Sequence, residues 1–374
     1  MKFDEFRLDE ITLNYDKERI PLSAMEREKR QGKYRYYGAQ GIIDYVNDYI
    51  FDGKYLLIAE DGENLKSKKQ NIAQIVEGQF WVNNHAHIVK CNEKCILEYL
   101  AYLVNCKDVS GYITGSAQPK LSQANLNAMT FNIPPVAYQK KCLSVLLPIE
   151  HKIKLNTAIN NNLEQQAKAL YKDWFFDFTP FSTDDNLPDG WRLGTVGDII
   201  QLHDSKRVPL SGAERDKMAK IYPYYGATSL MDYVDNYLFD GIYLLLGEDG
   251  TVVDSLGFPI LQYVYGQFWV NNHAHIITGK EGFSVEELYL LFSLTNIKSI
   301  ITGAVQQKVS QQNLKKVPAI IPSKEALSAF DDLIQPIFAQ IRNLRDENAH
   351  LADLRDTLLP RLMSGELDVS NIDL

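Results

Sequence analysis

One repeat runs through the whole chain, and it restricts the fold to two copies of a single unit. The nine residues QFWVNNHAH occupy positions 79–87 and recur unchanged at 267–275, an offset of 188 positions. Because the chain has 374 residues, two copies of this length account for all of it without visible gaps. A period this long indicates a duplicated domain rather than a solenoid. The same offset relates YYGA at 36–39 to 224–227, FDG at 51–53 to 239–241, and EDG at 60–62 to 248–250.

Each copy divides into an α/β part and a helical part. Short apolar runs such as YLLIA at 55–59, followed by Glu-Asp-Gly, are typical of strands that end in turns. After about residue 135 of each copy, the apolar spacing becomes helical. We therefore predict an α/β domain over 1–135, a central helix over 136–179, a second α/β domain over 180–323 and a C-terminal helix over 324–374.

Both helical segments carry apolar residues spaced three and four apart, which predicts a coiled-coil seam. The first helix leads into the second copy and the second helix starts where that copy ends, so we expect them to pair antiparallel. The predicted fold class is α/β (α+β), with two domains in tandem separated by two long antiparallel coiled-coil helices in a pseudo-two-fold arrangement. The seam comprises Leu146, Ile149, Ile153, Asn156, Asn160, Leu163 and Leu170 in the first helix, and Ile334, Ile337, Ile341, Leu344, Asn348, Leu351 and Leu358 in the second.

Four polar or helix-breaking residues qualify this seam. Asn160 and Asn348 occupy equivalent heptad positions, where a polar residue fixes the register of two helices at some cost in stability. Pro148 and Pro336 are expected to kink or restart each helix near its beginning.

Composition places the chain among ordinary globular proteins. Hydrophobic residues make up 45% and charged residues 23% of the sequence, which excludes disordered, collagen-like and disulfide-rich classes. No apolar run approaches the roughly 18 residues of a membrane helix, and the N-terminus lacks a signal-peptide core, so we expect a cytoplasmic protein without membrane contact. The four cysteines, Cys91, Cys95, Cys106 and Cys142, are absent from the second copy, which indicates core packing rather than a metal or disulfide framework.

Charge and its distribution leave DNA open as a ligand. The net charge is −9, but residues 1–188 carry 23 Lys+Arg against 24 Asp+Glu, while residues 189–374 carry 16 against 24. DNA responds to local patches rather than to net charge. Cations interleaved with aromatic and amide groups are the contact set for phosphates and base edges. The candidate DNA-binding residues are Arg19, Arg27, Lys29, Arg30, Lys33, Arg35, Tyr36, Lys68, Gln118, Lys120 and Ser122 in the first copy, and Arg207, Arg215, Lys217, Tyr224, Gln306, Lys308 and Ser310 in the second.

A catalytic site is less well supported by the sequence. His85 and His87, with Glu60 and Asp61, could ligate a metal and support a metal-dependent nuclease or phosphodiesterase as an alternative function. A structural or DNA-facing role for these repeated polar residues is the favoured interpretation. The chain contains neither a phosphate-binding loop nor a dinucleotide-binding motif, so we assign no catalytic residue and no metal.

Four motifs, one of them present in both copies, resemble the specificity (S) subunit of type I restriction–modification enzymes. LPDGWRLGTVGDI resembles the entry into a target-recognition domain of that family, and the two TG-containing stretches resemble its closing motif. The remaining two resemble the ends of its central and C-terminal helices. The stretches are Leu187–Ile199, Thr114–Leu126 with its copy Thr302–Leu314, Ala169–Phe178, and Leu358–Leu367. The match covers the whole chain, although the two domains here are much more alike than in many family members.

This resemblance implies a non-catalytic subunit that gives a partner enzyme its address on DNA. Each α/β domain would be a target-recognition domain for one half of a bipartite, interrupted double-stranded DNA site, with the helices as spacers. Methyltransferase (M) subunits that use S-adenosylmethionine, and restriction (R) subunits that use ATP and Mg, would assemble with the chain, which itself would need no cofactor. A stand-alone DNA-binding regulator remains a second alternative.

Overall fold

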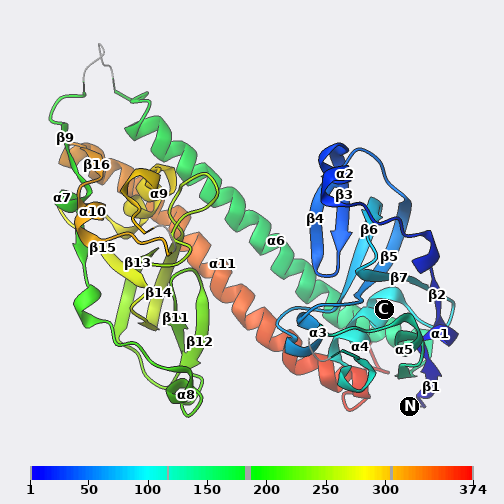
Figure 1. Cartoon of the computed structure of the whole chain (residues 1–374). Coiled ribbons are helices and arrows are strands. Elements are labelled where there is room, and N and C mark those ends of the chain that lie inside the picture. The colour runs from blue at the N-terminus through cyan, green and yellow to red at the C-terminus, as the bar shows by residue number, and fades with distance from the viewer. Residues whose placement is uncertain (1, 116–117, 182–186, 304–305, 373–374) are drawn as a thin grey trace. The chain divides into compact units, whose positions relative to one another are not determined.

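The computed structural model describes residues 2–115, 118–181, 187–303 and 306–372 (Figure 1). The chain forms two compact units. Unit one comprises Met1–Lys154 and Glu347–Leu374, and unit two comprises Leu155–Asp346. Each unit therefore contains the α/β part of one copy together with segments of both long helices.

Unit one is built on a six-stranded mixed sheet. Its strand order is β2-β7-β5-β6-β3-β4, with β3 parallel to β6 and the other neighbours antiparallel. A separate antiparallel pair joins β1 to β8. The elements are β1 (Asp4–Arg7), α1 (Leu8–Ile11), β2 (Thr12–Asn14), α2 (Ala24–Glu28), β3 (Gln31–Gly38), β4 (Gly41–Val46), β5 (Phe51–Ala59), α3 (Asn64–Ser67), β6 (Ala73–Val82), β7 (Ala86–Cys91), α4 (Leu97–Cys106), α5 (Gln123–Asn127) and β8 (Thr130–Ile133).

Unit two repeats this topology. Its sheet has the order β10-β15-β13-β14-β11-β12, in which β11 runs parallel to β14, as β3 does to β6 in unit one. A separate antiparallel pair joins β16 to β9. In place of α3, unit two has an isolated bridge between Val253 and Pro259 and a turn at 255–256. The elements are β9 (Arg192–Thr195), α7 (Val196–Ile199), β10 (Ile200–Leu202), α8 (Gly212–Arg215), β11 (Tyr222–Tyr225), β12 (Leu230–Val234), β13 (Phe239–Gly247), β14 (Leu261–Val270), β15 (Ala274–Gly279), α9 (Val285–Leu294), α10 (Gln311–Lys315) and β16 (Pro318–Ile321).

The central strand of each sheet is buried on both faces, which explains its continuous apolar run. In β5, Leu56 and Ile58 pack into a core with α4, whereas Leu57 packs on the opposite face with Phe51 and Phe80. A strand covered on both sides is hydrophobic at every position rather than at alternate ones.

The prediction that the cysteines pack in the core is only partly right, because Cys95 and Cys142 are buried whereas Cys106 is exposed.

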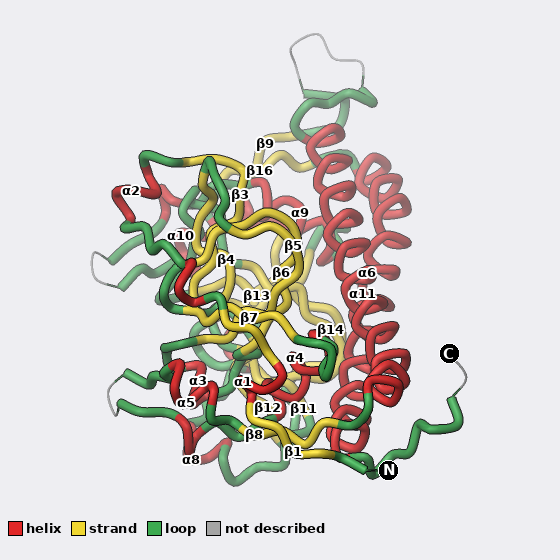
Figure 2. The backbone as a smooth tube through the Cα atoms, turned by 90° about the vertical axis from the view of Figure 1, so that its right-hand side faces the viewer, coloured by secondary structure: helices red, strands yellow, loops and turns green. Residues whose placement is uncertain are grey.

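Two long helices, α6 (Val136–Phe175) and α11 (Lys324–Ser364), pack side by side (Figure 2). In unit one, Asn348 Nδ2 donates to the Ile153 carbonyl at 3.4 Å; in unit two, Asn160 Nδ2 donates to the Ile341 carbonyl at 3.4 Å. Later residues of one helix thus meet earlier residues of the other, which is the predicted antiparallel pairing.

The fold class is confirmed. All the predicted seam residues are buried or half-buried, including Ile149, Leu163, Leu170, Ile337, Leu351 and Leu358. Of the two outcomes expected at the prolines, the restart is wrong, because both helices continue through Pro148 and Pro336, and the kink stays a prediction. The four-segment division of the chain stays a prediction. No helix among the described residues is long and apolar enough to span a membrane.

Candidate nucleic-acid interface

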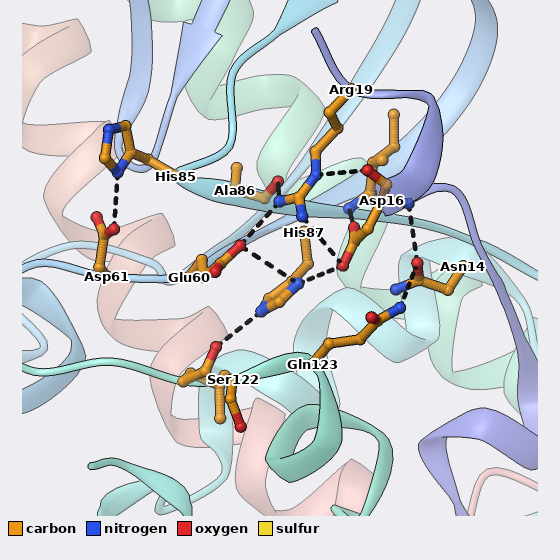
Figure 3. A network of polar contacts seen from close by, with 12 residues as sticks. Asn14, Asp16, Arg19, Glu60, Asp61, His85, Ala86, His87, Ser122 and Gln123 are labelled. Atoms are coloured by element: carbon orange, nitrogen blue, oxygen red, sulfur yellow. Dashed lines mark hydrogen bonds and ion pairs between the residues drawn. The ribbon is translucent and has the colours of Figure 1, made fainter. Parts of the chain in front are cut away.

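A buried polar network lies beside the sheet of unit one (Figure 3). It joins the segment between β2 and β3 to the start of β7. His87 Nδ1 lies 2.6 Å from Asp16 Oδ2, and His87 Nε2 lies 2.8 Å from the carbonyl of Leu121. Both ring nitrogens face oxygen atoms, so the ring is held from both sides. The other Asp16 oxygen accepts from the backbone N–H of Ile88 at 2.9 Å. The network therefore ties β7 to the segment that carries Leu121.

Arg19 links the two carboxylates of this network. Its guanidinium donates to Glu60 Oε2 at 2.8 Å and to the Ala86 carbonyl at 2.7 Å, and it lies 3.5 Å from Asp16. Lys120 Nζ lies 3.2 Å from the second Glu60 oxygen. The two buried acids are thus matched by nearby cations, as buried charges require.

The electrostatics of both acids agree with this pairing. Burial alone raises the pKa of the Asp16 carboxyl, but the hydrogen bond and charge of His87, the Ile88 N–H and the Arg19 charge bring it below its ordinary value. Burial likewise raises the pKa of Glu60, and Arg19, His87 and Lys120 together lower it below its ordinary value. Both groups are therefore held as carboxylates at neutral pH.

The network supports the two described ends of a loop, Thr114–Gly115 and Gln118–Lys120. Thr114 and Lys120 exchange backbone hydrogen bonds of 2.8 Å, which close the loop. Gly115 has φ +83°, and a Cβ there would lie 2.3 Å from the Gln118 carbonyl, so glycine is required. The backbone N–H of Leu121 donates to the Glu60 carbonyl at 2.7 Å. The loop is thus anchored at its closing end, and Gln118 and Lys120 are exposed.

An exposed pair flanks the anchored loop. His85 Nδ1 lies 2.7 Å from Asp61 Oδ2, and the His85 side chain is 50% exposed. Asp61 forms a backbone bridge with Lys120. His85, Asp61, Gln118 and Lys120 are therefore polar side chains gathered at the outer end of the buried network.

Unit two contains the same arrangement with closely matched distances. His275 Nδ1 lies 2.6 Å from Asp204, and Arg207 donates to Glu248 at 2.6 Å. Lys308 Nζ lies 3.4 Å from Glu248. Burial raises the pKa of Asp204, but the hydrogen bond and charge of His275 outweigh it and hold the pKa below its ordinary value.

One contact of the network differs between the units. Gln123 donates to Asn14 at 2.9 Å in unit one, whereas Gln311 donates directly to Asp204 at 2.6 Å in unit two. The change follows from the sequence, because Leu202 stands where the first copy has Asn14 and offers no acceptor.

Comparisons with known proteins match both copies. The family described as the type I restriction modification DNA specificity domain matches residues 1–165 and 188–349. The chain belongs to this specificity family.

Individual relatives agree with that assignment. The type I restriction enzyme MjaIX specificity subunit of Methanocaldococcus jannaschii is 26% identical over 306 residues, covering 74% of this chain and 70% of the relative. The type I restriction enzyme HindI specificity subunit of Haemophilus influenzae is 24% identical, covering 88% of this chain and 87% of the relative. The crystal structure of the type I restriction–modification S subunit from M. genitalium matches with a TM-score of 0.61 at 13% identity, covering 97% of this chain and 96% of that chain. This last likeness shows a shared fold.

Several residues that we predicted to contact DNA have structural roles instead. Arg19 and Arg207 have side chains only 13% exposed and are held by buried carboxylates, so they cannot reach a duplex. Tyr36 and Tyr224 are fully buried, and their hydroxyls accept from backbone N–H groups at 2.8 and 3.0 Å.

Two further pairs are also corrected. Arg27 and Arg215 are mostly buried and pair with Asp44 and Asp232 at 2.9 and 3.1 Å. Each ion pair holds a short helix, α2 or α8, against a neighbouring strand, β4 or β12. The hydroxyls of Ser122 and Ser310 accept from backbone N–H groups three residues on and cap α5 and α10. These side chains stabilise the domain rather than bind a ligand.

The remaining candidates lie at the surface. All of them are exposed except Arg35, which is half-buried and donates to the Glu77 carbonyl. Lys68 has φ +47° and donates to the Lys107 carbonyl at 2.9 Å. The exposed candidates are Lys29, Arg30, Lys33, Lys68, Gln118 and Lys120 in unit one, and Lys217, Gln306 and Lys308 in unit two.

The metal-site alternative does not fit this geometry. Its four proposed ligands separate into an exposed pair, His85 with Asp61, and a buried set in which His87 contacts Asp16. In unit two, the acids and the histidine at the same place lie close enough to share a cation. There the Arg207 guanidinium already contacts both acids, and it supplies the positive charge that a metal would.

Sequence reasoning missed Asp16 and Asp204, which are central to both networks. Each recurs at the repeat offset, three residues before Arg19 or Arg207. This recurrence was the available signal.

Proposed function

We propose that this chain is the DNA-specificity subunit of a type I restriction–modification complex and reads a bipartite, interrupted DNA site, one half-site for each copy. The observation that carries the proposal is that the DNA specificity family matches each copy separately, over residues 1–165 and 188–349. A chain with two such domains has two places at which to read a duplex.

The anchored loop supplies suitable chemistry for reading DNA. Lysine contacts phosphates, an amide such as that of Gln118 pairs with adenine, and a histidine or carboxylate offers donors or acceptors to base edges. A recognition loop is more selective when buried partners fix its geometry. The network of Asp16, Arg19, Glu60 and His87 provides that support in unit one.

The contact residues we propose are those that reach the surface. Lys29, Arg30, Lys33, Arg35 and Lys68 in unit one, with Lys217 in unit two, are proposed phosphate contacts. Gln118 and Lys120, with Gln306 and Lys308, are proposed contacts of the two loops. His85 and Asp61 join this set because they lie beside Lys120.

The chemistry on DNA is assigned to partner subunits. We propose that methyltransferase subunits using S-adenosylmethionine and restriction subunits using ATP and Mg assemble with this chain. The relatives named as specificity subunits of type I restriction enzymes support this, as does the internal use of the buried acids and histidines by Arg19 and Arg207.

Affinity purification from the native host tests this proposal. The tagged full chain should retain a methyltransferase that transfers methyl groups from S-adenosylmethionine to duplex DNA, and that transfer should require the chain. A chain that selects specific duplexes but retains no methyltransferase would indicate the stand-alone regulator. A chain that neither selects DNA nor retains such a partner would contradict the proposal.

A further inference from the structure

The two copies resemble each other far more than the chain resembles its relatives. Nearly half of the residues between 8 and 126 are identical to the residue 188 positions later. The chain is only 26% and 24% identical to the specificity subunits of M. jannaschii and H. influenzae. The similarity between the copies therefore exceeds what the shared fold alone requires.

The buried support of the two loops is nearly superposable. The histidine–aspartate distance is 2.6 Å in both units, and the distance from the second histidine nitrogen to its carbonyl is 2.8 Å in both. The arginine–glutamate distances are 2.8 and 2.6 Å, and the lysine–glutamate distances are 3.2 and 3.4 Å. Each loop is thus held in the same frame.

The exposed polar groups on this frame are also the same. His85 and His273 are 50% and 47% exposed and pair with Asp61 and Asp249 at 2.7 and 2.6 Å. Lys120 and Lys308 are 54% and 52% exposed, and Gln118 matches Gln306. These four donors and acceptors are shared by the two units, so they select the same base edges.

The surface charges that differ lie on other elements. Arg30, Lys33 and Arg35, around α2 and β3, become Met218, Ile221 and Pro223. Lys66, Lys68 and Lys69, around α3, become Asp254, Leu256 and Gly257. Such cations contact phosphates, which strengthens binding without reading sequence.

The loops themselves differ in sequence at three uncharged positions. These are residues 116, 117 and 119 against 304, 305 and 307, of which 116, 117, 304 and 305 lie outside the described residues. Every charged or amide-bearing residue of the first loop, from Thr114 to Lys120, is retained in the second copy, which adds one exposed amide, Gln307, where the first copy has the buried Pro119.

We infer that both copies read the same half-site sequence, so that the target is one short sequence present twice, in direct or inverted order, across an unread gap. This inference rests on the proposed function and narrows the class of DNA site. The two halves differ in the number of phosphate contacts, not in the base pairs that are read.

Selection from random duplexes tests this inference. The full chain, with whatever subunits co-purify, is incubated with duplexes that carry two randomised blocks separated by gaps of varied length, and the bound duplexes are sequenced. We expect the same block sequence on both sides of the gap. Two enriched blocks of different sequence would overturn the inference and leave the proposed function standing. Absence of any enriched block would contradict the proposed function and the inference with it.

A matched pair of variants gives a second, independent readout. Gln118→Ala and Gln306→Ala each remove one exposed amide, so both variants should fold. We expect each to lower discrimination at the same base-pair position, in one half-site each, by roughly 5- to 150-fold. Loss of discrimination at two different positions of the half-site would overturn the inference.

Discussion

Replacing the two loop lysines tests whether these loops contact the DNA backbone. In Lys120→Ala with Lys308→Ala, one cation is removed from the equivalent place in each copy. Each lysine is about half exposed and its nearest acid is also bound by an arginine, at 2.8 Å for Arg19 and 2.6 Å for Arg207. The acids therefore keep a partner, and loss of an exposed ion pair costs only about 0–1 kcal/mol. The domains should remain folded.

The expected effect follows from counter-ion release. Each phosphate contact contributes about 0.9 to the slope of log affinity against log salt concentration. Loss of two contacts should therefore lower the slope by about 1.8. Between about 0.05 and 0.2 M KCl, the affinity of the parent should fall about twelvefold more than that of the double variant.

Fluorescence anisotropy with a labelled duplex carrying the selected site measures this slope over a KCl series. Lys172→Ala is the matched control, because Lys172 is 60% exposed, pairs with Asp177 at 2.6 Å and belongs to α6 rather than to either loop. The control should keep the parent slope. A double variant with the parent slope would remove both lysines from the contact set.

Four further predictions concern stability and charge. Burial raises the pKa of Glu287 to about 8. Between about pH 4.3 and pH 8 the folded protein therefore keeps a proton on Glu287 that the unfolded chain has released, so the free energy of unfolding falls by about 1.4 kcal/mol for each pH unit of increase. Glu287→Gln should raise the melting temperature at pH 8 much more than at pH 5, and equal shifts at the two pH values would contradict this. Asn160 Oδ1 is buried without a partner among the described residues, so Asn160→Leu should stabilise the helix pair by about 1–2 kcal/mol in urea denaturation, and a lower midpoint would be the contrary result. Asp16→Ala leaves the buried His87 ring and the Ile88 N–H without their acceptor, while Arg19 keeps Glu60. It should cost about 3–5 kcal/mol of unfolding free energy, whereas a loss below about 1 kcal/mol would show that the network is not structural. Leu256 is 70% exposed at the position equivalent to Lys68, so Leu256→Lys should steepen the salt slope by about 0.9 and leave the selected sequence unchanged, and an altered half-site would show that this segment reads bases.

The repeat and the helix seam were predictable because they depend on spacing along the chain. Ile149 and Leu163 in α6, and Ile337 and Leu358 in α11, pack as their three- and four-residue steps require. The duplicated sheets follow from the same offset. Of the outcomes expected at the prolines, the restart is ruled out, because each helix continues through its proline.

The roles of individual cations were not predictable in the same way. Arg19 and Lys120 both recur at the repeat offset, so recurrence alone cannot separate a buried support from a surface contact. The difference lies in partners far along the chain: Glu60 is 41 residues from Arg19 and meets it only after folding. The same holds for Tyr36, whose hydroxyl accepts a hydrogen bond from the backbone N–H of Leu22, 14 residues away.

Genome-wide methylation mapping tests the central claim, that this chain supplies the address for a DNA-modifying complex. DNA from the native host is compared with DNA from the same strain lacking the chain and from that strain with the chain restored. The account predicts that one interrupted sequence motif loses methylation without the chain and regains it on restoration. Methylation patterns that are identical in all three strains would contradict it.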